Sequence, residues 1–373
     1  MNKTSVYIHT PYCKSKCRYC DFPSFSGMED TVSEYFSALS KEISRSVHRG
    51  KKIDTVFFGG GTPSYVNEKY IAGVMDTLRE NFTLSENCEI TIETNPGTLT
   101  KDKLSTYKDC CINRISMGMQ CHDDRILSVL GRIHTSEDII NGVELINSVG
   151  ITNYNLDIMC ALPTQKLRDL EKSLEFAVKL NPTHISAYSL IIEEGTPFYD
   201  TWQELDLPDE EEERKMYHLC KDYLASYGYE RYEVSNYAKE GYICRHNKYC
   251  WDYEDYIGFG SAAHSFCRPV RWENVADVHG YISAIKNNTS PVRTFEELTR
   301  EDMIEEYIML ALRKTEGIEI SRLREEFGYD ILSHKSIELS ALIKSGYVGI
   351  NDNNLFITEK GFDIADSITL KLL

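Results

Sequence analysis

The sequence lacks any long apolar segment. No apolar run in its 373 residues approaches the roughly 18 residues that a membrane-spanning helix needs. The segment 1–10 also lacks the apolar stretch and the small-residue cleavage site of a signal peptide. With 42% hydrophobic and 27% charged residues, the composition is typical of a soluble globular chain. We therefore expect a cytoplasmic protein that is not an integral membrane protein.

Positive charge is also scarce. The chain has 41 Lys and Arg residues against 58 Asp and Glu residues, a net charge of −17. Because nonspecific attraction to phosphates needs clustered Lys and Arg, nucleic acid is not expected as a partner. Twelve cysteines in a chain expected in the reducing cytoplasm indicate metal ligands or buried thiols rather than a disulfide framework.

The first half of the chain alternates β-rich and helical segments. Strands are expected at 6–9, 53–58, 89–93, 114–117, 155–159 and 184–188. Parallel strands need long crossover connections, which the intervening helical segments supply. The pattern predicts an α/β fold with a partial (β/α)6 barrel over residues 1–205. In such barrels functional groups gather at the carboxyl ends of the strands.

The second half of the chain has a different pattern. The acidic run 209–213 is expected to begin a solvated helix rather than to bind a metal, and residues 206–290 are expected to extend the barrel. Helices near 300–313, 318–326 and 333–345 precede a hairpin over 347–357 with its turn at 352–354. Residues 291–373 therefore predict a C-terminal α+β domain that is winged-helix-like.

A cysteine motif follows the first expected strand. Cys13, Cys17 and Cys20 have the spacing C-x3-C-x2-C in a loop. Three soft thiolates can hold a [4Fe-4S] cluster and leave its fourth iron open to an external ligand. A zinc site completed by His9 is the alternative, and the neighbouring motifs favour the cluster.

Five motifs together resemble one known family. They are Tyr7-Ile-His-Thr-Pro-Tyr-Cys13, the cysteine triplet, Gly59-Gly-Gly-Thr-Pro63, Glu93-Thr-Asn-Pro96 and Ser116-Met-Gly-Met-Gln120. This set is similar to the radical S-adenosylmethionine (SAM) superfamily and, within it, to the oxygen-independent coproporphyrinogen III dehydrogenases and their HemW-type heme-chaperone relatives. The resemblance runs nearly end to end, and it implies a [4Fe-4S] cluster and SAM as cofactors.

The resemblance also indicates a SAM site at the barrel mouth. Glycines at the end of a strand let the backbone approach a ligand, and a guanidinium suits a carboxylate. Glu93, Gln120 and Asp157 are expected at or just past the ends of successive strands, where polar groups can bind a ribose or an amine. Taken singly, these polar residues could equally be helix caps or surface groups. The expected SAM-binding residues are Tyr7, Gly60, Gly61, Thr62, Glu93, Gln120, Arg132 and Asp157.

Three features favour a heme chaperone over a dehydrogenase. Cys20 is followed by Asp21-Phe22, whereas the dehydrogenases have a further cysteine there, and only twelve residues precede Cys13. The stretch His246-Asn-Lys-Tyr-Cys-Trp251 resembles a heme-associated motif, with Cys250 in place of its tyrosine. We therefore expect binding of heme and its transfer to acceptor proteins, including membrane-associated respiratory proteins, with coproporphyrinogen III dehydrogenation as the alternative.

The heme ligand is left open by the sequence. His246 is the first candidate, and Cys244 and Cys250 are thiols in the same stretch. The alternative for His246 is an ordinary buried histidine beside aromatic residues. The heme acceptor, a second SAM, the need for SAM cleavage and the oligomeric state, a homodimer included, also stay open. Whether the protein is an enzyme is therefore undecided at this level.

Overall fold

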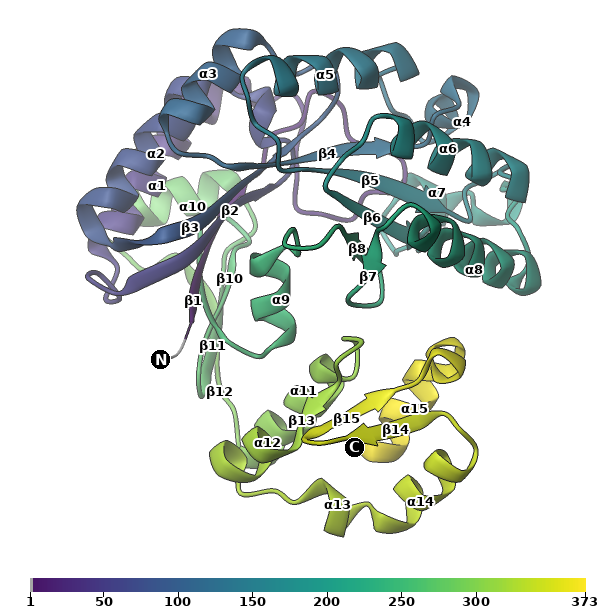
Figure 1. The fold of residues 1–373 in the computed structure, drawn as a ribbon. Helices are drawn as coiled ribbons and strands as arrows, with labels where there is room; N and C mark the ends of the chain where they lie inside the picture. The colour runs from purple at the N-terminus through teal and green to yellow at the C-terminus, as the bar shows by residue number, and fades with distance from the viewer. Residues whose placement is uncertain (1–2) are drawn as a thin grey trace.

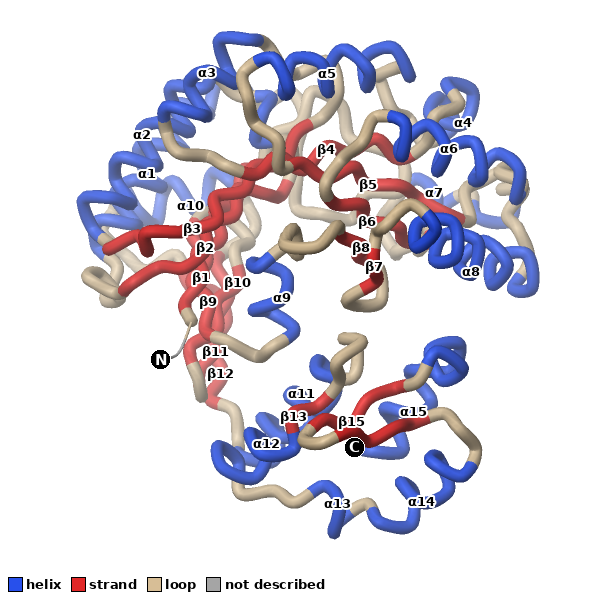
Figure 2. The backbone as a smooth tube through the Cα atoms, viewed as in Figure 1, coloured by secondary structure: helices blue, strands red, loops and turns tan. Residues whose placement is uncertain are grey.

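The computed structural model describes residues 3–373 and contains one large curved sheet (Figures 1 and 2). Its 12 strands have the order β12-β11-β10-β9-β1-β2-β3-β4-β5-β6-β8-β7. The strands are β1 (Thr4–Thr10), β2 (Lys52–Gly60), β3 (Thr83–Thr94), β4 (Arg114–Gln120), β5 (Tyr154–Cys160), β6 (His184–Ser189), β7 (Glu230–Arg231), β8 (Asn236–Ala238), β9 (Asp255–Phe259), β10 (His264–Cys267), β11 (Val270–Asn274) and β12 (Val292–Glu297).

Strands β1 to β6 are parallel and adjacent in chain order, so the six predicted strands and the α/β class are confirmed. Helices connect them, as parallel pairing requires. Figure 1 shows α1, α2, α3 and α5 along the convex side of the sheet and α9 on its other side. The helices of this part are α1 (Val32–Arg45), α2 (Glu68–Asn81), α3 (Lys101–Asp109), α4 (Asp124–Val129), α5 (Ser136–Ser148), α6 (Leu167–Lys179), α7 (Pro197–Asp200), α8 (Glu210–Ser226), α9 (Arg245–Trp251) and α10 (Val278–Lys286). Helix α8 begins at the predicted acidic run, with the Asp209 side chain accepting a hydrogen bond from the Glu212 amide.

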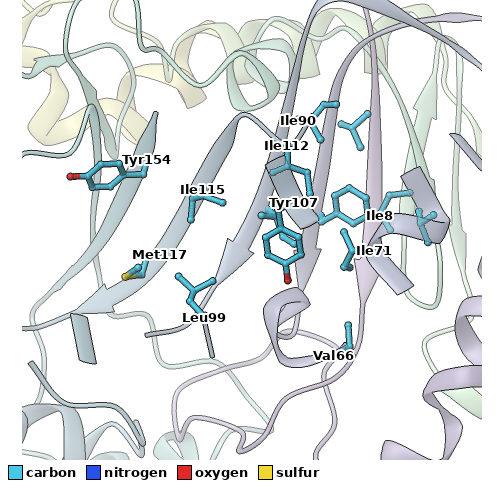
Figure 3. Close-up of a cluster of buried hydrophobic side chains, with 14 of the residues drawn as sticks. Ile8, Val66, Ile71, Ile90, Leu99, Tyr107, Ile112, Ile115, Met117 and Tyr154 are labelled. Atoms are coloured by element: carbon cyan, nitrogen blue, oxygen red, sulfur yellow. The ribbon is translucent and has the colours of Figure 1, made fainter. Parts of the chain in front are cut away.

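The two faces of the parallel strands differ in chemistry. Side chains alternate between the faces along a strand. The outer residues of β1, β3 and β4, such as Ile8, Ile90 and Ile115, join the main apolar core beneath the helices (Figure 3). The inner residues of β3, Glu89 and Glu93 among them, are polar. The convex face therefore supplies the core, and the concave face is left for polar chemistry.

The remaining strands extend the sheet at both edges. Strand β9 pairs in parallel with β1, and β10, β11 and β12 continue as antiparallel strands. Strand β12 lies just past residue 291, where the last domain was expected to begin, and still pairs with β11. The division into 1–205, 206–290 and 291–373 stays a prediction.

The C-terminal part has its own core and a small antiparallel sheet of order β13-β15-β14. Its elements are α11 (Arg300–Ala311), β13 (Ile318–Glu319), α12 (Ile320–Phe327), α13 (Ile331–His334), α14 (Ser336–Lys344), β14 (Val348–Asn351), β15 (Asn354–Ile357) and α15 (Ala365–Leu372). The predicted hairpin is present, but its turn is shorter than expected: Asn351 pairs with Asn354, so only Asp352 and Asn353 form it. The predicted third helix is divided into α13 and α14. None of the helices within residues 3–373 is long and apolar enough to cross a bilayer.

Candidate functional site

The cysteine loop lies between β1 and α1 and folds back on itself. The Cys13 amide donates to the Phe25 carbonyl at 2.9 Å, and the Phe25 amide donates to the Pro11 carbonyl at 2.7 Å. Cys13 is buried, Cys17 and Cys20 are half-buried, and all three are free thiols. Half-buried thiols on one short loop are able to bind a metal cluster while protecting it from water.

The donor set fits a cluster better than a single zinc ion. In residues 3–373 no group of three His, Cys, Asp or Glu side chains is close enough to hold one ion. A [4Fe-4S] cluster does not need such a group, because each of its thiolates binds a different iron. Burial, followed by the charges of Cys17 and Cys13, raises the pKa of Cys20.

His9 does not act as a fourth zinc ligand, because both of its ring nitrogens have partners. Nε2 donates to the Pro23 carbonyl at 2.8 Å, and Nδ1 lies 3.1 Å from the Tyr7 hydroxyl. Burial lowers the pKa of His9 to about 4, so the ring is neutral. The zinc alternative from the sequence therefore loses its fourth ligand.

The glycine motif at the end of β2 touches the cysteine loop. The Gly61 amide donates to the Thr10 carbonyl at 2.8 Å, and a Cβ on Gly61 would lie 2.7 Å from the Tyr12 carbonyl oxygen. Gly60 has φ +109°, and a Cβ there would lie 2.5 Å from the His9 ring. These glycines bring the strand end against the loop, whereas the sequence suggested only an approach to a ligand.

A chain of hydrogen bonds links two of the cysteines across the mouth, by which we mean the carboxyl ends of the barrel strands. Thr62 Oγ1 lies 3.5 Å from Cys13 Sγ and accepts from Asn95 Nδ2 at 3.0 Å. Asn95 Oδ1 accepts from Arg132 Nη2 at 2.7 Å, and Arg132 Nη1 donates to Cys17 Sγ at 3.5 Å. Thr62, Asn95, Arg132 and Cys17 also line one pocket. Hydrogen bonds within the protein therefore fix the positions of the side chains at the mouth.

Asn95 is a site residue that sequence reasoning missed. It joins the two predicted residues Thr62 and Arg132 through its amide. The signal was available, because Asn95 lies in the motif Glu93-Thr-Asn-Pro96, directly after β3. Only its contacts distinguish it from an ordinary turn residue.

Two of the predicted carboxylates share the concave face. Glu93 Oε2 accepts from the Gly60 amide at 3.2 Å, and burial together with the Asp157 charge raises the pKa of Glu93 to about 8. Asp157 accepts from Asn155 Nδ2 at 2.6 Å, and burial raises its pKa as well. Asp157 lies inside β5, where it pairs with Ser186, and not at a strand end as expected. The pair forms a half-buried acidic site suited to a cationic group.

Gln120 and Tyr7 lie on the same concave face. Gln120 is the last residue of β4, has φ +65°, and accepts from the Tyr188 hydroxyl at 3.2 Å. Burial, followed by the Glu93 charge, raises the pKa of Tyr7 well above its usual value. The predicted residues from β1, β3, β4 and β5 therefore converge on one interior, although only some of them reach the mouth.

His246 lies away from the mouth, on α9, against the inner face of β2. Its ring stacks on Phe57 with centroids 4.9 Å apart, and Nδ1 lies 2.9 Å from Thr55 Oγ1. Glu89 holds the start of α9 by accepting from the Arg245 and His246 amides at 3.1 and 3.0 Å. Only 6% of His246 is exposed. We call this region, at the amino ends of the barrel strands, the floor.

The tautomer of His246 follows from its neighbours. Thr55 Oγ1 donates its single hydrogen to Ser5 Oγ at 2.8 Å, so it can only accept from His246 Nδ1. Burial, and then the charge of Arg114, lowers the pKa of His246 to about 3, so the ring is neutral. The lone pair is therefore on Nε2, which has no hydrogen-bond partner among the described residues.

The two neighbouring thiols have a different character. Cys244 is fully buried and its thiol lies 3.7 Å from Glu89 Oε1. Burial raises the pKa of both Cys244 and Cys250 to about 12. Both side chains are therefore protonated thiols, which are poor metal ligands.

Comparisons with known proteins identify the family of this chain. Residues 7–177 match the radical SAM superfamily, and residues 298–364 match the HemN C-terminal domain. The chain is 35% identical to the heme chaperone HemW of Bacillus subtilis over 362 residues, which covers 96% of each chain. It is 30% identical to the heme chaperone HemW of Lactococcus lactis over 371 residues, covering 99% of this chain and 97% of that one.

Among solved structures, the fold is similar to that of coproporphyrinogen III oxidase (HemN) from Escherichia coli, a radical SAM enzyme. The TM-score is 0.87 over 100% of this chain and 90% of that one, at 22% identity, a likeness that shows the fold alone. The fold and the cysteine loop thus define a member of the radical SAM superfamily, which implies a [4Fe-4S] cluster and SAM as cofactors. Within that superfamily, the chain belongs to the HemW family.

Proposed function

We propose that this protein is a cytoplasmic heme chaperone that binds heme and transfers it to acceptor proteins, including membrane-associated respiratory proteins. The observation that carries the proposal is the similarity to the heme chaperone HemW of Bacillus subtilis over 96% of both chains. That similarity includes α9 and the C-terminal part as well as the barrel. The likeness to coproporphyrinogen III oxidase concerns the fold alone, so it does not favour dehydrogenation.

In this proposal Cys13, Cys17 and Cys20 hold the [4Fe-4S] cluster. When bound and reduced, such a cluster supplies one electron to SAM. Two protein groups act on the thiolates directly: Arg132 donates to Cys17 Sγ, and Thr62 Oγ1 lies beside Cys13 Sγ. A hydrogen bond from a cation stabilises a thiolate, so Arg132 favours the ligand form of Cys17.

The SAM site of the proposal comprises Tyr7, Gly60, Gly61, Thr62, Glu93, Gln120, Arg132 and Asp157. SAM carries a sulfonium, an amine and a carboxylate. The half-buried Glu93 and Asp157 suit the positive groups, because a bound cation would offset the desolvation that raises their pKa values. The guanidinium of Arg132 suits the carboxylate.

His246 is the proposed heme ligand. Neutral imidazole is the form that binds iron, and the free lone pair of His246 is on Nε2. The thiols of Cys244 and Cys250 are protonated, so they are weaker candidates. Because the His246 side chain of α9 is buried against β2, heme binding requires this helix of seven residues to move or the ligand to enter the concave face.

A heme titration under anaerobic conditions tests this site. We expect the Soret band to shift when the parent protein binds heme. The affinity of His246→Ala for heme should be at least tenfold lower, because one strong ligand is lost. His264→Ala is the matched control, since His264 is exposed. Equal heme binding by His246→Ala and the parent would contradict the assignment.

Two further assays test the function. Heme-loaded protein mixed with apomyoglobin, a convenient heme acceptor, should pass its heme on, as followed by the myoglobin Soret band. Reduced protein with SAM and anaerobic coproporphyrinogen III should yield no protoporphyrinogen. Formation of protoporphyrinogen would replace the chaperone proposal with the dehydrogenase.

A further inference from the structure

The floor of the barrel contains polar side chains brought together by strand register. Thr91 on β3 pairs with Arg114 on β4, and Asn155 on β5 pairs with His184 on β6. Thr91 lies between Glu89 and Glu93 in the alternation of β3, so it faces the concave side with them. These inner residues do not belong to the apolar core, which lies on the other face of the sheet.

Arg114 has an unusual environment for a buried cation. It is only 2% exposed, and its Nε is enclosed without a hydrogen-bond partner. No Asp or Glu within the described part of the chain lies at ion-pair distance from its guanidinium. The Oγ1 of its neighbour Thr91 is likewise enclosed and unpartnered. Two adjacent buried polar groups therefore have unused hydrogen-bonding capacity.

The nearby carboxylates make no direct contact with this cation, because their oxygens are hydrogen-bonded elsewhere. Burial alone would lower the pKa of Arg114, and surrounding charges, those of Glu89 and Asp157 among them, raise it from longer range. Glu89 accepts from the two amides at the start of α9, and Asp157 accepts from Asn155. A buried charge without a partner is costly to a fold. A guanidinium kept in this state beside a free hydroxyl is suited to an anionic group supplied by a ligand.

We infer that Arg114 and Thr91 bind a carboxylate of the heme, one of its two propionates, at the floor of the barrel. This inference rests on the proposed function and deepens it. His246, the proposed iron ligand, shares this region, since its amide donates to Glu89 at 3.0 Å and Glu89 lies two residues before Thr91 on the same face of β3. Iron and carboxylate would thus be held by neighbouring side chains of the same interior.

The carboxylate of SAM is a less suitable occupant of this site. Its proposed partner, Arg132, lies beside Cys17 at the mouth. Arg114 and Gln120 are the two ends of β4, so about 20 Å of strand separates the floor from the mouth, at roughly 3.3 Å per residue. The two arginines therefore lie at different ends of the barrel, and each is available to a different carboxylate.

The experiment compares heme with heme dimethyl ester, which has no free carboxylate, on the full-length parent, Arg114→Met and Thr91→Val proteins. We expect the parent to bind heme roughly 10- to 100-fold more tightly than the ester, since hydrogen bonds to charged groups are the strong ones. Arg114→Met should bind the two ligands equally, and Thr91→Val should lose about threefold for heme only. Equal binding of heme by Arg114→Met and the parent would overturn the inference.

Thermal unfolding of the heme-free proteins separates a binding role from a structural one. If Arg114 is kept for a ligand, Arg114→Met should unfold at the same temperature as the parent or higher, because an unpaired buried charge is removed. A lower unfolding temperature would overturn the inference in favour of a structural role.

SAM binding by equilibrium dialysis should be unchanged in Arg114→Met. A loss for SAM with heme affinity retained would overturn the assignment to heme. Failure of the parent itself to bind heme would instead contradict the proposed function, and this inference with it.

Discussion

Two arginines, buried Arg114 and half-buried Arg132, lie at opposite ends of the barrel and show how differently the same side chain is used. Arg132 at the mouth donates to Cys17, Asn95, Gly118 and His134. Arg114 at the floor has no such partner, and its Nε is enclosed and unpaired. The mouth is therefore organised by the protein before any cofactor binds, whereas the floor retains a charge that a ligand can complete. A preorganised end and an end with unused hydrogen-bonding capacity therefore coexist in one barrel.

The largest expected effect is at the mouth, where Arg132 donates to Cys17. Cys17→Ala should abolish the cluster, because two thiolates cannot retain it. Iron and sulfide content and the visible absorbance after anaerobic reconstitution measure this loss. Cys111→Ala is the control, since Cys111 is exposed and outside the loop. Normal cluster content in Cys17→Ala would show that Cys17 is not a cluster ligand, and the mouth could then not be contrasted with the floor as a cofactor site.

A second charged group with several hydrogen-bond partners, Glu42 on α1, lies behind the mouth. This half-buried carboxylate accepts from the Gly260 amide at 2.9 Å, from Asn274 Nδ2 at 2.7 Å and from the Tyr281 hydroxyl at 2.6 Å. Burial nevertheless raises the pKa of Glu42 from 4.5 to about 7. The folded state then binds the proton more tightly than the unfolded chain, so the contribution is greatest at low pH and is lost as the pH rises to about 7.

Denaturant unfolding of the parent and Glu42→Gln between pH 5 and 8 tests this sign. We expect the free energy of unfolding of the parent to fall relative to that of the variant by about 2 to 3 kcal/mol over this range. A difference that is independent of pH would show that the hydrogen bonds to Glu42 fully compensate its burial.

Arg132→Gln should weaken SAM binding roughly 10- to 100-fold, because a charged hydrogen-bond donor to the ligand is lost. Equilibrium dialysis with the reconstituted protein measures this change. Arg125→Gln, at an exposed position on α4, is the matched control. The heme affinity of Arg132→Gln should not change. A loss of heme affinity as large as the loss of SAM affinity would contradict separate roles for the mouth and the floor.

Asn95→Ala should have the smallest effect. Its amide positions Thr62 and Arg132, so its removal should weaken SAM binding about three- to tenfold through loss of neutral hydrogen bonds. Asn95→Asp restores the acceptor toward Arg132 but not the donor toward Thr62. Partial rescue by Asn95→Asp would identify the Arg132 contact as the important one, and an unchanged SAM affinity in Asn95→Ala would exclude a positioning role.

The strand pattern and the cysteine spacing are local properties, so they could be predicted. Alternation of β-rich and helical segments identifies β1 to β6, and Cys13, Cys17 and Cys20 lie on one short loop. The hairpin turn was set one residue too long, because the pairing of Asn351 with Asn354 depends on register. Asp157 was expected at a strand end, but β5 continues past it to Cys160.

The sequence by itself determined the fold class and the family and predicted the cysteine ligand set, since these depend on residue types at fixed spacings. Only the tertiary structure decided that Asn95 joins Thr62 to Arg132, that His9 is unavailable to a metal, and that Arg114 and Thr91 are left unpaired at the floor. Contacts between strands far apart in the chain depend on register and burial. Register and burial are set only when the sheet has formed and curved around its polar interior.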